Sequence, residues 1–475
     1  MRAKNRLTRT CAARWPTGVL GLSLCVLLAA CGGDGDGEVS APPALPSPPG
    51  ASGPTPAQPV AIYSVGGTIS GLVSGTQMTL LNNGGDALTV NANDTFAFST
   101  SIASGSGYAV SLGTQPKGQT CAVSNGAGSV AASNITNINV VCTRIAYAYV
   151  TNNDGTVSQY TIGADGALTP MATSSVRAGA NPTSVTVDTS GKYAYVANYL
   201  DNTISQFTIG ADGALSPMAT AIVGTGNRPA SVTVEPSGKY AYVANQVNRS
   251  VSQYTIGADG ALSPMAIASV IVGGNPNTMA IDPTGKYAYV ACYSNNTVSQ
   301  FTIGADGALS PMATASVNAS TFPWFVTVDP TGKYAYVANQ NANTVSQYTI
   351  GADGALSPMA TASVSTGINP KSIAVDPTGK YAYVGNEADN AVSQYTIGAD
   401  GSLVPMTTPR VSVGNVPDSV TVDPSGKYVY VANYGSNTVS QFTIGANGAL
   451  SPMSPASVST GILPGFVTTT YAVTH

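Results

Sequence analysis

The chain has 475 residues, of which 43% are hydrophobic and only 8% are charged, and its formal net charge is −4. This sparse, slightly acidic charge excludes the basic surface that proteins use to bind nucleic acid, so we expect no nucleic-acid partner. The single histidine is the final residue, His475. Histidine-dependent catalytic arrangements and histidine-based zinc sites therefore lack their imidazole, and we expect no metal and no cofactor.

Residues 1–30 have the pattern of a secretory signal peptide, because basic residues precede a short apolar run from Val19 to Leu28. The run is too short for a permanent transmembrane helix. It ends in LLAAC, which resembles the lipobox of bacterial lipoproteins and implies that Cys31 carries a lipid. We therefore expect a lipid-anchored protein of the bacterial cell envelope, and the outer membrane because Gly32 follows the cysteine. A secreted product without lipid is the alternative.

Two segments separate this anchor from the rest of the chain. Residues 31–60 are rich in Pro, Gly and Ser and poor in large apolar residues, which predicts an extended tether. Residues 61–143 alternate apolar and polar residues in short runs between Gly, Asn and Ser clusters. This pattern predicts a small antiparallel β-sandwich, similar to the immunoglobulin-like modules of bacterial surface proteins. We expect it to be a spacer, with a carbohydrate or protein contact as the alternative.

Three cysteines lie beyond the predicted lipidation site. Cys121 and Cys142 belong to the predicted sandwich, and an exported chain permits a disulfide between them. Cys292 replaces the asparagine found at the same place in most copies of the repeat described next. We interpret it as a partly buried thiol rather than as a nucleophile.

Residues 144–475 repeat one unit, marked by a Tyr-Val pair, with a period of 46 and then 47 residues. In the second copy the unit contains four β-prone runs, SVTVD, KYAYVAN, TISQFTI and LSPM, the last at Leu215 to Met218. Seven copies of four antiparallel strands predict a seven-bladed β-propeller, so the whole chain is expected to be all-β. The tyrosines of the pair are Tyr149, Tyr195, Tyr242, Tyr289, Tyr336, Tyr383 and Tyr430.

The two ends of the repeat region complement each other. The first copy begins at its second run, and FVTTT, Phe466 to Thr470, supplies the first run that it lacks. We therefore expect one blade to be closed by both ends of the repeat region. A proline in each outermost run suits an exposed edge strand and discourages pairing with another molecule, so we expect a monomer.

The repeat YAYVTNNDGTVSQYTI, at Tyr147 to Ile162, and its six relatives resemble the YVTN-type β-propeller repeat of bacterial and archaeal surface proteins. That family is grouped with the lactonase-like seven-bladed propellers related to 6-phosphogluconolactonase. The resemblance implies the same fold. Related lactonases and cycloisomerases are thought to use basic and acidic side chains in a cleft on one face of the propeller, but no catalytic motif of the family can be matched here residue by residue.

The repeats treat the two faces of the propeller differently. On one face the turns DPSGK or DPTGK and GADGAL are nearly constant, which indicates turn chemistry. Calcium is the alternative for the Asp-Gly turns, but the Asp-x-Asp-x-Asp-Gly spacing is absent. On the other face the copies differ around a shared proline, and the residue after it is different in all seven. We expect these residues to surround the mouth of the central channel: Thr183, Ala230, Asn277, Trp324, Lys371, Asp418 and Gly465.

Loops that vary on a rigid frame commonly bind ligands, although unconstrained loops also drift. For Trp324 the alternative is a plug between two blades. We expect the variable face to bind a glycan, a peptide or another envelope protein, and we assign no catalytic residue. The candidate binding residues are Arg177, Asn181, Arg228, Arg249, Phe322, Trp324, Lys371, Glu387 and Asp418.

Two hypotheses of function follow. The first is an envelope lipoprotein whose propeller is a surface binding or scaffold module, which the anchor, the spacer and the near-identical blades favour. The second is a lactonase-like hydrolase, which the resemblance and the charged residues of the variable face favour. The missing histidine weakens the second hypothesis, so we expect binding rather than catalysis.

Overall fold

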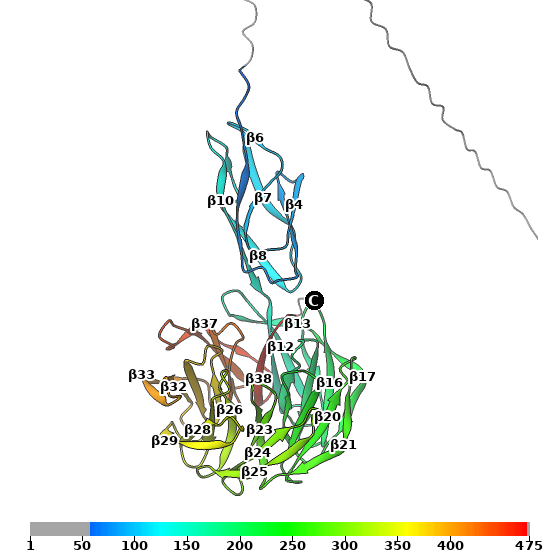
Figure 1. Cartoon of the computed structure of the whole chain (residues 1–475), viewed down its shortest axis with the longest axis vertical. Coiled ribbons are helices and arrows are strands. Elements are labelled where there is room, and N and C mark those ends of the chain that lie inside the picture. The colour runs from blue at the N-terminus through cyan, green and yellow to red at the C-terminus, as the bar shows by residue number, and fades with distance from the viewer. Residues whose placement is uncertain (1–57, 473–475) are drawn as a thin grey trace, which may run out of the picture. The chain divides into compact units, whose positions relative to one another are not determined.

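The computed structural model describes residues 58–472, in which every regular element is a β-strand (Figure 1). The predicted signal peptide, the lipidation site Cys31, most of the tether and His475 lie outside the described residues. In the part of the chain that is described, no helix is long and apolar enough to cross a membrane. The all-β fold class is confirmed.

Residues 62–144 form two four-stranded sheets, with strand orders β5-β2-β10-β8 and β4-β3-β7-β9, and a short pair β1-β6. The alternation of apolar and polar residues explains these strands. In β3, for example, alternate residues are buried, including Met78 and Leu80. The ten strands are β1 (Ile62–Tyr63), β2 (Val65–Ser70), β3 (Met78–Asn82), β4 (Asp86–Val90), β5 (Thr95–Ala97), β6 (Ile102–Ala103), β7 (Gly107–Thr114), β8 (Gln119–Ser124), β9 (Ala127–Ser129) and β10 (Ile135–Arg144).

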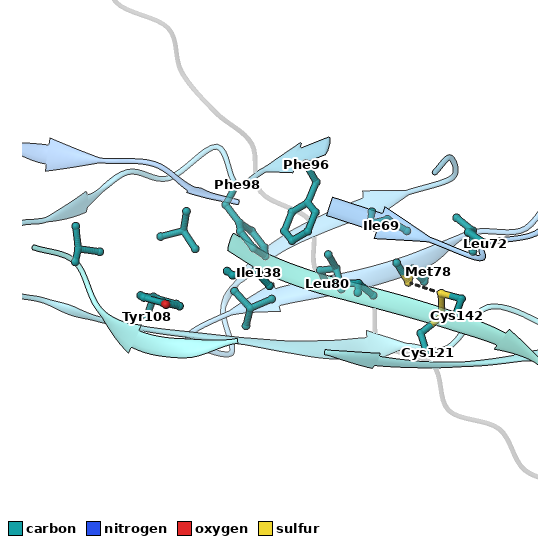
Figure 2. Close-up of a cluster of buried hydrophobic side chains, with 14 residues drawn as sticks. Ile69, Leu72, Met78, Leu80, Phe96, Phe98, Tyr108, Cys121, Ile138 and Cys142 are labelled. Carbon is teal, nitrogen blue, oxygen red and sulfur yellow. Dashed lines mark hydrogen bonds between the residues drawn. A yellow bond between two sulfur atoms is a disulfide. The ribbon is translucent and has the colours of Figure 1, made fainter. Parts of the chain in front are cut away.

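The two sheets share one apolar core, drawn in Figure 2, in which Leu80 and Ile138 are fully buried. Cys121 and Cys142 are joined by a disulfide between the paired strands β8 and β10, beside Met78. The expectation of a wholly antiparallel sandwich was wrong, because β10 pairs with β2 in parallel. The first and last long strands of this segment thus run the same way, so the chain enters at one end of these sheets and leaves at the other.

The following residues form seven four-stranded sheets, the blades of a propeller. Blade 1 has the order β13-β12-β11-β38, and blades 2 to 7 are β14–β17, β18–β21, β22–β25, β26–β29, β30–β33 and β34–β37. The innermost strand of each blade, which is β38 in blade 1, contacts the innermost strands of both neighbouring blades, and these contacts close the ring. The predicted seven-bladed architecture is therefore confirmed.

The strands of blades 1 to 3 are β11 (Ala146–Asn152), β12 (Thr156–Ile162), β13 (Leu168–Arg177), β14 (Pro182–Val187), β15 (Tyr193–Asn198), β16 (Thr203–Ile209), β17 (Leu215–Gly224), β18 (Pro229–Val234), β19 (Tyr240–Asn245), β20 (Ser250–Ile256) and β21 (Leu262–Ile271). Those of blades 4 to 7 are β22 (Pro276–Ile281), β23 (Tyr287–Cys292), β24 (Thr297–Ile303), β25 (Leu309–Asn318), β26 (Pro323–Val328), β27 (Tyr334–Asn339), β28 (Thr344–Ile350), β29 (Leu356–Ser365), β30 (Pro370–Val375), β31 (Tyr381–Asn386), β32 (Ala391–Ile397), β33 (Leu403–Ser412), β34 (Pro417–Val422), β35 (Tyr428–Asn433), β36 (Thr438–Ile444) and β37 (Leu450–Ser459). The last strand is β38 (Pro464–Tyr471), which belongs to blade 1.

The outermost strands are longer than the four-residue LSPM run predicts. Strand β17 has ten residues and pairs with β16 on both sides of an irregularity between Ser205 and Phe207. The proline in the run, Pro217, lies opposite Phe207 on this edge strand. The second half of the strand was missed because its sequence, ATAIVG in this copy, is mostly exposed and carries no clear apolar alternation.

Blade 1 is closed by strands from both ends of the repeat region, as predicted. Strand β38 pairs antiparallel with β11, and the register places Val467 opposite Val150. Both valines are buried in the same core. Figure 1 shows the red strand β38 among the blue-green strands of this blade. The pairing covers an edge of β11 that would otherwise be open.

Buried hydrogen bonds join each blade to the next. Between blades 4 and 5, the Tyr289 hydroxyl donates to the Gly354 carbonyl at 2.6 Å, and the Leu356 N–H donates to Gln300 Oε1 at 2.7 Å. Burial raises the pKa of Tyr289, so the phenol stays a neutral donor. Gly354 has a φ of 80°, and a Cβ there would overlap the Tyr287 ring, which explains the constant glycine. Both bonds recur at all seven interfaces.

The constant turns on one face are structural. In blade 4, Asp282 Oδ1 accepts the backbone N–H groups of Lys286 and Tyr287 at 2.8 and 2.7 Å, and Oδ2 accepts that of Thr284 at 3.0 Å. The carboxylate thus satisfies the donors of its own turn. Among residues 58–472 no group of three or more His, Cys, Asp or Glu side chains is arranged to hold a metal.

The closure of blade 1 can be tested by truncation. Deleting residues 464–475 removes β38, exposes the edge of β11 and opens the Val150 core, so we expect the free energy of unfolding to fall by at least about 3 kcal/mol. Aggregation through the exposed edge should accompany this loss. Thermal unfolding and light scattering measure both effects, with a chain lacking only residues 473–475 as the control. Equal melting temperatures for the two truncated chains would contradict the role given to β38.

Candidate functional site

Two rings of residues surround one mouth of the propeller channel, on the face where the repeats vary. The inner ring consists of the second residue of the innermost strand in each blade, which is β38 in blade 1. The outer ring consists of the residue that follows the strand paired with it, which is β11 in blade 1. The inner ring consists of Gly465, Thr183, Ala230, Asn277, Trp324, Lys371 and Asp418 in blades 1 to 7. The outer ring consists of Asn153, Tyr199, Gln246, Tyr293, Gln340, Glu387 and Tyr434 in the same order.

A left-handed residue before the shared proline holds both rings in place through backbone hydrogen bonds. The residue before the shared proline has a left-handed conformation in six blades, for example Phe322 with a φ of 63° and Val416 with a φ of 55°. The Val416 carbonyl accepts the N–H of the outer-ring residue Tyr434 at 2.8 Å, and its own N–H donates to Asn390 Oδ1 in the preceding blade at 2.8 Å. Such a conformation is unfavourable for a β-branched residue such as valine, and strain of this kind tends to be retained at functional sites.

All seven inner-ring residues line one cavity of about 270 Å³. Four outer-ring residues, Asn153, Tyr199, Gln246 and Tyr434, also line it. The inner ring is uneven, because three neighbouring blades carry the aromatic or charged residues Trp324, Lys371 and Asp418, whereas three others carry the small uncharged residues Gly465, Thr183 and Ala230. The aromatic and charged groups are thus gathered on one side of the channel mouth.

Lys371 is the centre of a charged cluster in this cavity. Its Nζ lies 3.6 Å from Glu387 Oε2, 3.6 Å from Asp418 Oδ1 and 4.4 Å from the centroid of the Trp324 ring. The Lys371 side chain is only 14% exposed, and the two carboxylates are 28% and 29% exposed. Gln340 Nε2 donates to Glu387 Oε2 at 3.0 Å. One ammonium is thus shared by two carboxylates, so the cluster carries a net charge of −1 when all three groups are ionised.

The carboxyl group of Asp418 is perturbed. Burial in the channel is the largest cause and raises its pKa, because the charged form loses hydration there. The ammonium of Lys371 opposes this shift, and the negative charge of Glu387 adds to it. Solvent still reaches part of the side chain, so the group can exchange protons with water in the cavity. Asp418 therefore holds its proton at a higher pH than an ordinary aspartate does.

Aromatic and uncharged polar groups form the rest of the wall. Phe322 stacks on Trp324 with ring centroids 5.8 Å apart, and Tyr293 lies 5.6 Å from Trp324. In the preceding blades, the Tyr199 hydroxyl donates to Gln246 Oε1 at 2.9 Å, and Gln246 Nε2 donates to Asn277 Oδ1 at 2.8 Å. Asn277 Nδ2 in turn donates to the Trp324 carbonyl at 2.9 Å. The site therefore offers an aromatic surface, hydroxyl and amide groups, and one Lys-carboxylate cluster.

The model of one protein family, described as lactonase, 7-bladed β-propeller, matches residues 116–404 and 353–464, well over half of the chain. This chain belongs to the lactonase family of seven-bladed β-propellers. No curated protein matches it. The family assignment agrees with the resemblance of the repeats, and it supports the hydrolase hypothesis better than the scaffold hypothesis.

Solved structures share the fold of this lactonase-family protein. A candidate 6-phosphogluconolactonase from Bacteroides fragilis is 22% identical with a TM-score of 0.60, over 69% of this chain and 98% of that chain. The periplasmic gluconolactonase PpgL of Pseudomonas aeruginosa is 19% identical with a TM-score of 0.59, over 69% of this chain and 99% of that chain. At these identities the likeness concerns the fold alone.

The lactonase-family propeller brings together most, not all, of the residues predicted from its sequence. Asn181, Trp324, Lys371 and Asp418 line the cavity. Two more predicted residues, Glu387 and Phe322, contact members of this group. Arg228 lies at the rim, with its Cζ 5.4 Å from the centroid of the Tyr199 ring.

Arg177 and Arg249 do not join the site. Arg177 is the exposed last residue of the outer strand β13, and Arg249 is exposed in the turn after β19. Neither lines the cavity. The prediction relied on the charge of these two arginines alone. It failed because a position at the end of an outer strand or at the apex of a turn does not place a side chain at the channel.

Of the outer ring, only Glu387 was among the residues predicted from the sequence. Tyr199, Gln246 and Tyr434 follow the asparagine that ends the second strand, and the position reads N, Y, Q, Y, Q, E and Y in the seven blades. That variation at one fixed offset was a usable signal. Cys292 is fully buried beside Ser299, rather than partly buried as predicted, and burial raises the pKa of its thiol.

Replacing Asp418 tests the electrostatics of the cavity without any substrate. Folding raises the pKa of Asp418, so its ionised form is less favourable in the folded chain than in the unfolded chain. Asp418→Asn should therefore raise the melting temperature at pH 7, while Lys371 keeps Glu387 as a partner. As the pH falls from the raised pKa to the ordinary aspartate pKa of about 4, the wild-type carboxyl takes up a proton in the folded and then in the unfolded chain, so the advantage should shrink and then vanish. A variant that melts below wild type at pH 7 would contradict this account.

Proposed function

We propose that this protein hydrolyses a lactone in the cavity at the variable mouth of the propeller. The observation that carries the proposal is that Lys371 and Asp418 line that cavity in contact with each other, and that the Lys371 ammonium is shared with Glu387 behind it. Membership of the lactonase family supports it, and two proteins of similar structure are named as a candidate 6-phosphogluconolactonase and a gluconolactonase. The scaffold hypothesis has no comparable support.

The cluster contains the groups that ester hydrolysis requires. Water attacks the lactone carbonyl carbon and must lose a proton, and a carboxylate with a raised pKa is suited to accept it. We assign this role to Asp418. The negative charge that develops on the carbonyl oxygen needs a nearby cation, and Lys371 is the cation that lines the cavity.

The second step opens the lactone ring. The bond between the carbonyl carbon and the ring oxygen breaks, the oxygen takes up a proton, and the product is a hydroxycarboxylic acid. Either the proton held by Asp418 or one from the Lys371 ammonium can supply that oxygen, so no imidazole is required. Glu387 does not line the cavity, and its role is to hold Lys371 in position through the 3.6 Å contact.

The remaining wall would bind and orient the substrate. Trp324 and Phe325 provide an apolar surface, and Gln246 and Asn277, in the two preceding blades, provide hydrogen-bonding groups. A cavity of about 270 Å³ lies below the usual range for drug-sized ligands, about 300 to 1,000 Å³, so the substrate is small. If Cys31 carries a lipid as predicted, the hydrolysis takes place in the cell envelope.

Activity measurements test the assignment. Lys371→Met and Asp418→Asn should each lower kcat/KM for lactone hydrolysis by at least about 100-fold, since each removes charge stabilisation or proton transfer from the transition state. Lys380→Met is the matched control, because Lys380 belongs to the same blade but is exposed in a constant turn and does not line the cavity. Rates are measured on a panel of sugar and aromatic lactones after subtraction of spontaneous hydrolysis. A wild-type rate in either cavity variant would refute the assignment.

A further inference from the structure

The charges of the cavity bear on which lactones it can accept. Among the described residues that line it, Lys371 is the only cation and Asp418 the only carboxylate. The Lys371 ammonium already contacts Asp418 and Glu387, and it faces the Trp324 ring. A phosphate group entering the cavity would therefore meet a cluster with a surplus of negative charge, and like charges at contact distance repel.

Backbone amides do not supply a phosphate site either. The outer-ring N–H groups donate to carbonyls of the left-handed residues, for example Gln246 N to Arg228 O at 3.0 Å and Gln340 N to Phe322 O at 2.9 Å. Five of the six left-handed residues donate their own N–H groups to asparagine side chains, as Phe322 N does to Asn296 Oδ1 at 2.9 Å, and Asn181 is the exception. Nearly all the donors that could form an anion-binding nest at these loops are thus already bonded within the protein.

The Arg228 guanidinium at the rim is not placed to bind a phosphate in the cavity. Arg228 is exposed, packs over the Tyr199 ring and does not line the cavity. A buried, unpaired arginine would be expected in a site that recognises phosphate through paired hydrogen bonds.

The cavity is instead rich in groups that bind uncharged polar molecules. Thr183, Tyr199, Gln246 and Asn277 provide hydroxyl and amide groups on its wall. Each already donates one hydrogen bond within the protein, but the hydroxyl oxygens keep lone pairs and the amides keep a second N–H for a ligand. Trp324 contributes an aromatic surface of the kind that packs against the C–H face of a sugar ring. This combination suits a small lactone that carries several free hydroxyl groups.

We infer that the cavity selects uncharged, polyhydroxylated lactones of monosaccharide size and discriminates against the same lactones carrying a phosphate. The inference rests on the proposed function for its catalytic consequence and on the charge of the cavity for its binding consequence. It assigns the specificity to Glu387, because this carboxylate gives the Lys371 cluster its surplus negative charge.

A comparison of two lactones as substrates tests the catalytic consequence of the inference. We expect kcat/KM for an aldono-δ-lactone to exceed that for its 6-phosphate by at least about 10-fold in the wild-type chain, a modest discrimination for one misplaced charge. Glu387→Gln should narrow the ratio, whatever it does to the absolute rates. Asp389→Asn is the matched control, because this carboxylate lies two residues away, is bonded to Arg410 and does not line the cavity. A 6-phosphate that is hydrolysed as well as the free lactone overturns the inference.

A binding measurement separates this inference from the proposed function. In the full chain with Trp15→Phe, Trp324 is the only tryptophan, so its emission reports on the cavity. It is titrated with the non-hydrolysable lactam of the same sugar and with the phosphorylated lactam. Absence of hydrolysis for every lactone would refute the proposed function, and the titration would still decide selectivity. Tighter binding of the lactam than of its phosphate supports the inference, and equal binding, weaker binding or no response to either overturns it.

Discussion

The hydrogen bond from a buried tyrosine to a glycine carbonyl of the next blade is the contact on which the propeller depends. It recurs at all seven interfaces, and Tyr289 to Gly354 is one example. Replacing the tyrosine would leave the buried carbonyl without its donor, and the left-handed φ of the glycine disfavours any other residue there. The copies therefore stay constant at these two positions, and they differ most in the residues around the channel mouth, where the charged cluster lies.

The site arises from one position that three neighbouring blades fill differently. Trp324, Lys371 and Asp418 occupy equivalent places in blades 5, 6 and 7, and the ring geometry brings them into contact. The arrangement is unfavourable for stability, since burial raises the pKa of Asp418 and Val416 is held in a left-handed conformation. Such features are expected where function rather than folding determines the residue.

The repeat period and its four β-prone runs were sufficient to predict the seven blades and the shared first blade, because each run alternates with a fixed turn. The inner ring could also be predicted, since it is the one offset at which all seven copies differ. The contact of Glu387 with Lys371 could not, because it depends on the register of β30 with β31, which pairs Pro370 with Asn386 and has an irregularity between Pro370 and Ser372. The parallel pairing of β2 with β10 was likewise invisible, because alternation predicts strands but not which strands become neighbours.

The proposed hydrolysis depends on Asp418 as a base whose pKa is set by its surroundings. The pH dependence of kcat/KM tests this role most directly. We predict a loss of activity on the acidic side, with a midpoint above the usual aspartate pKa of about 4. Because the charge of Glu387 raises the pKa of Asp418, Glu387→Gln should move this midpoint to lower pH. An acidic limb near pH 4 that Glu387→Gln leaves in place, or no acidic limb at all, would contradict the account.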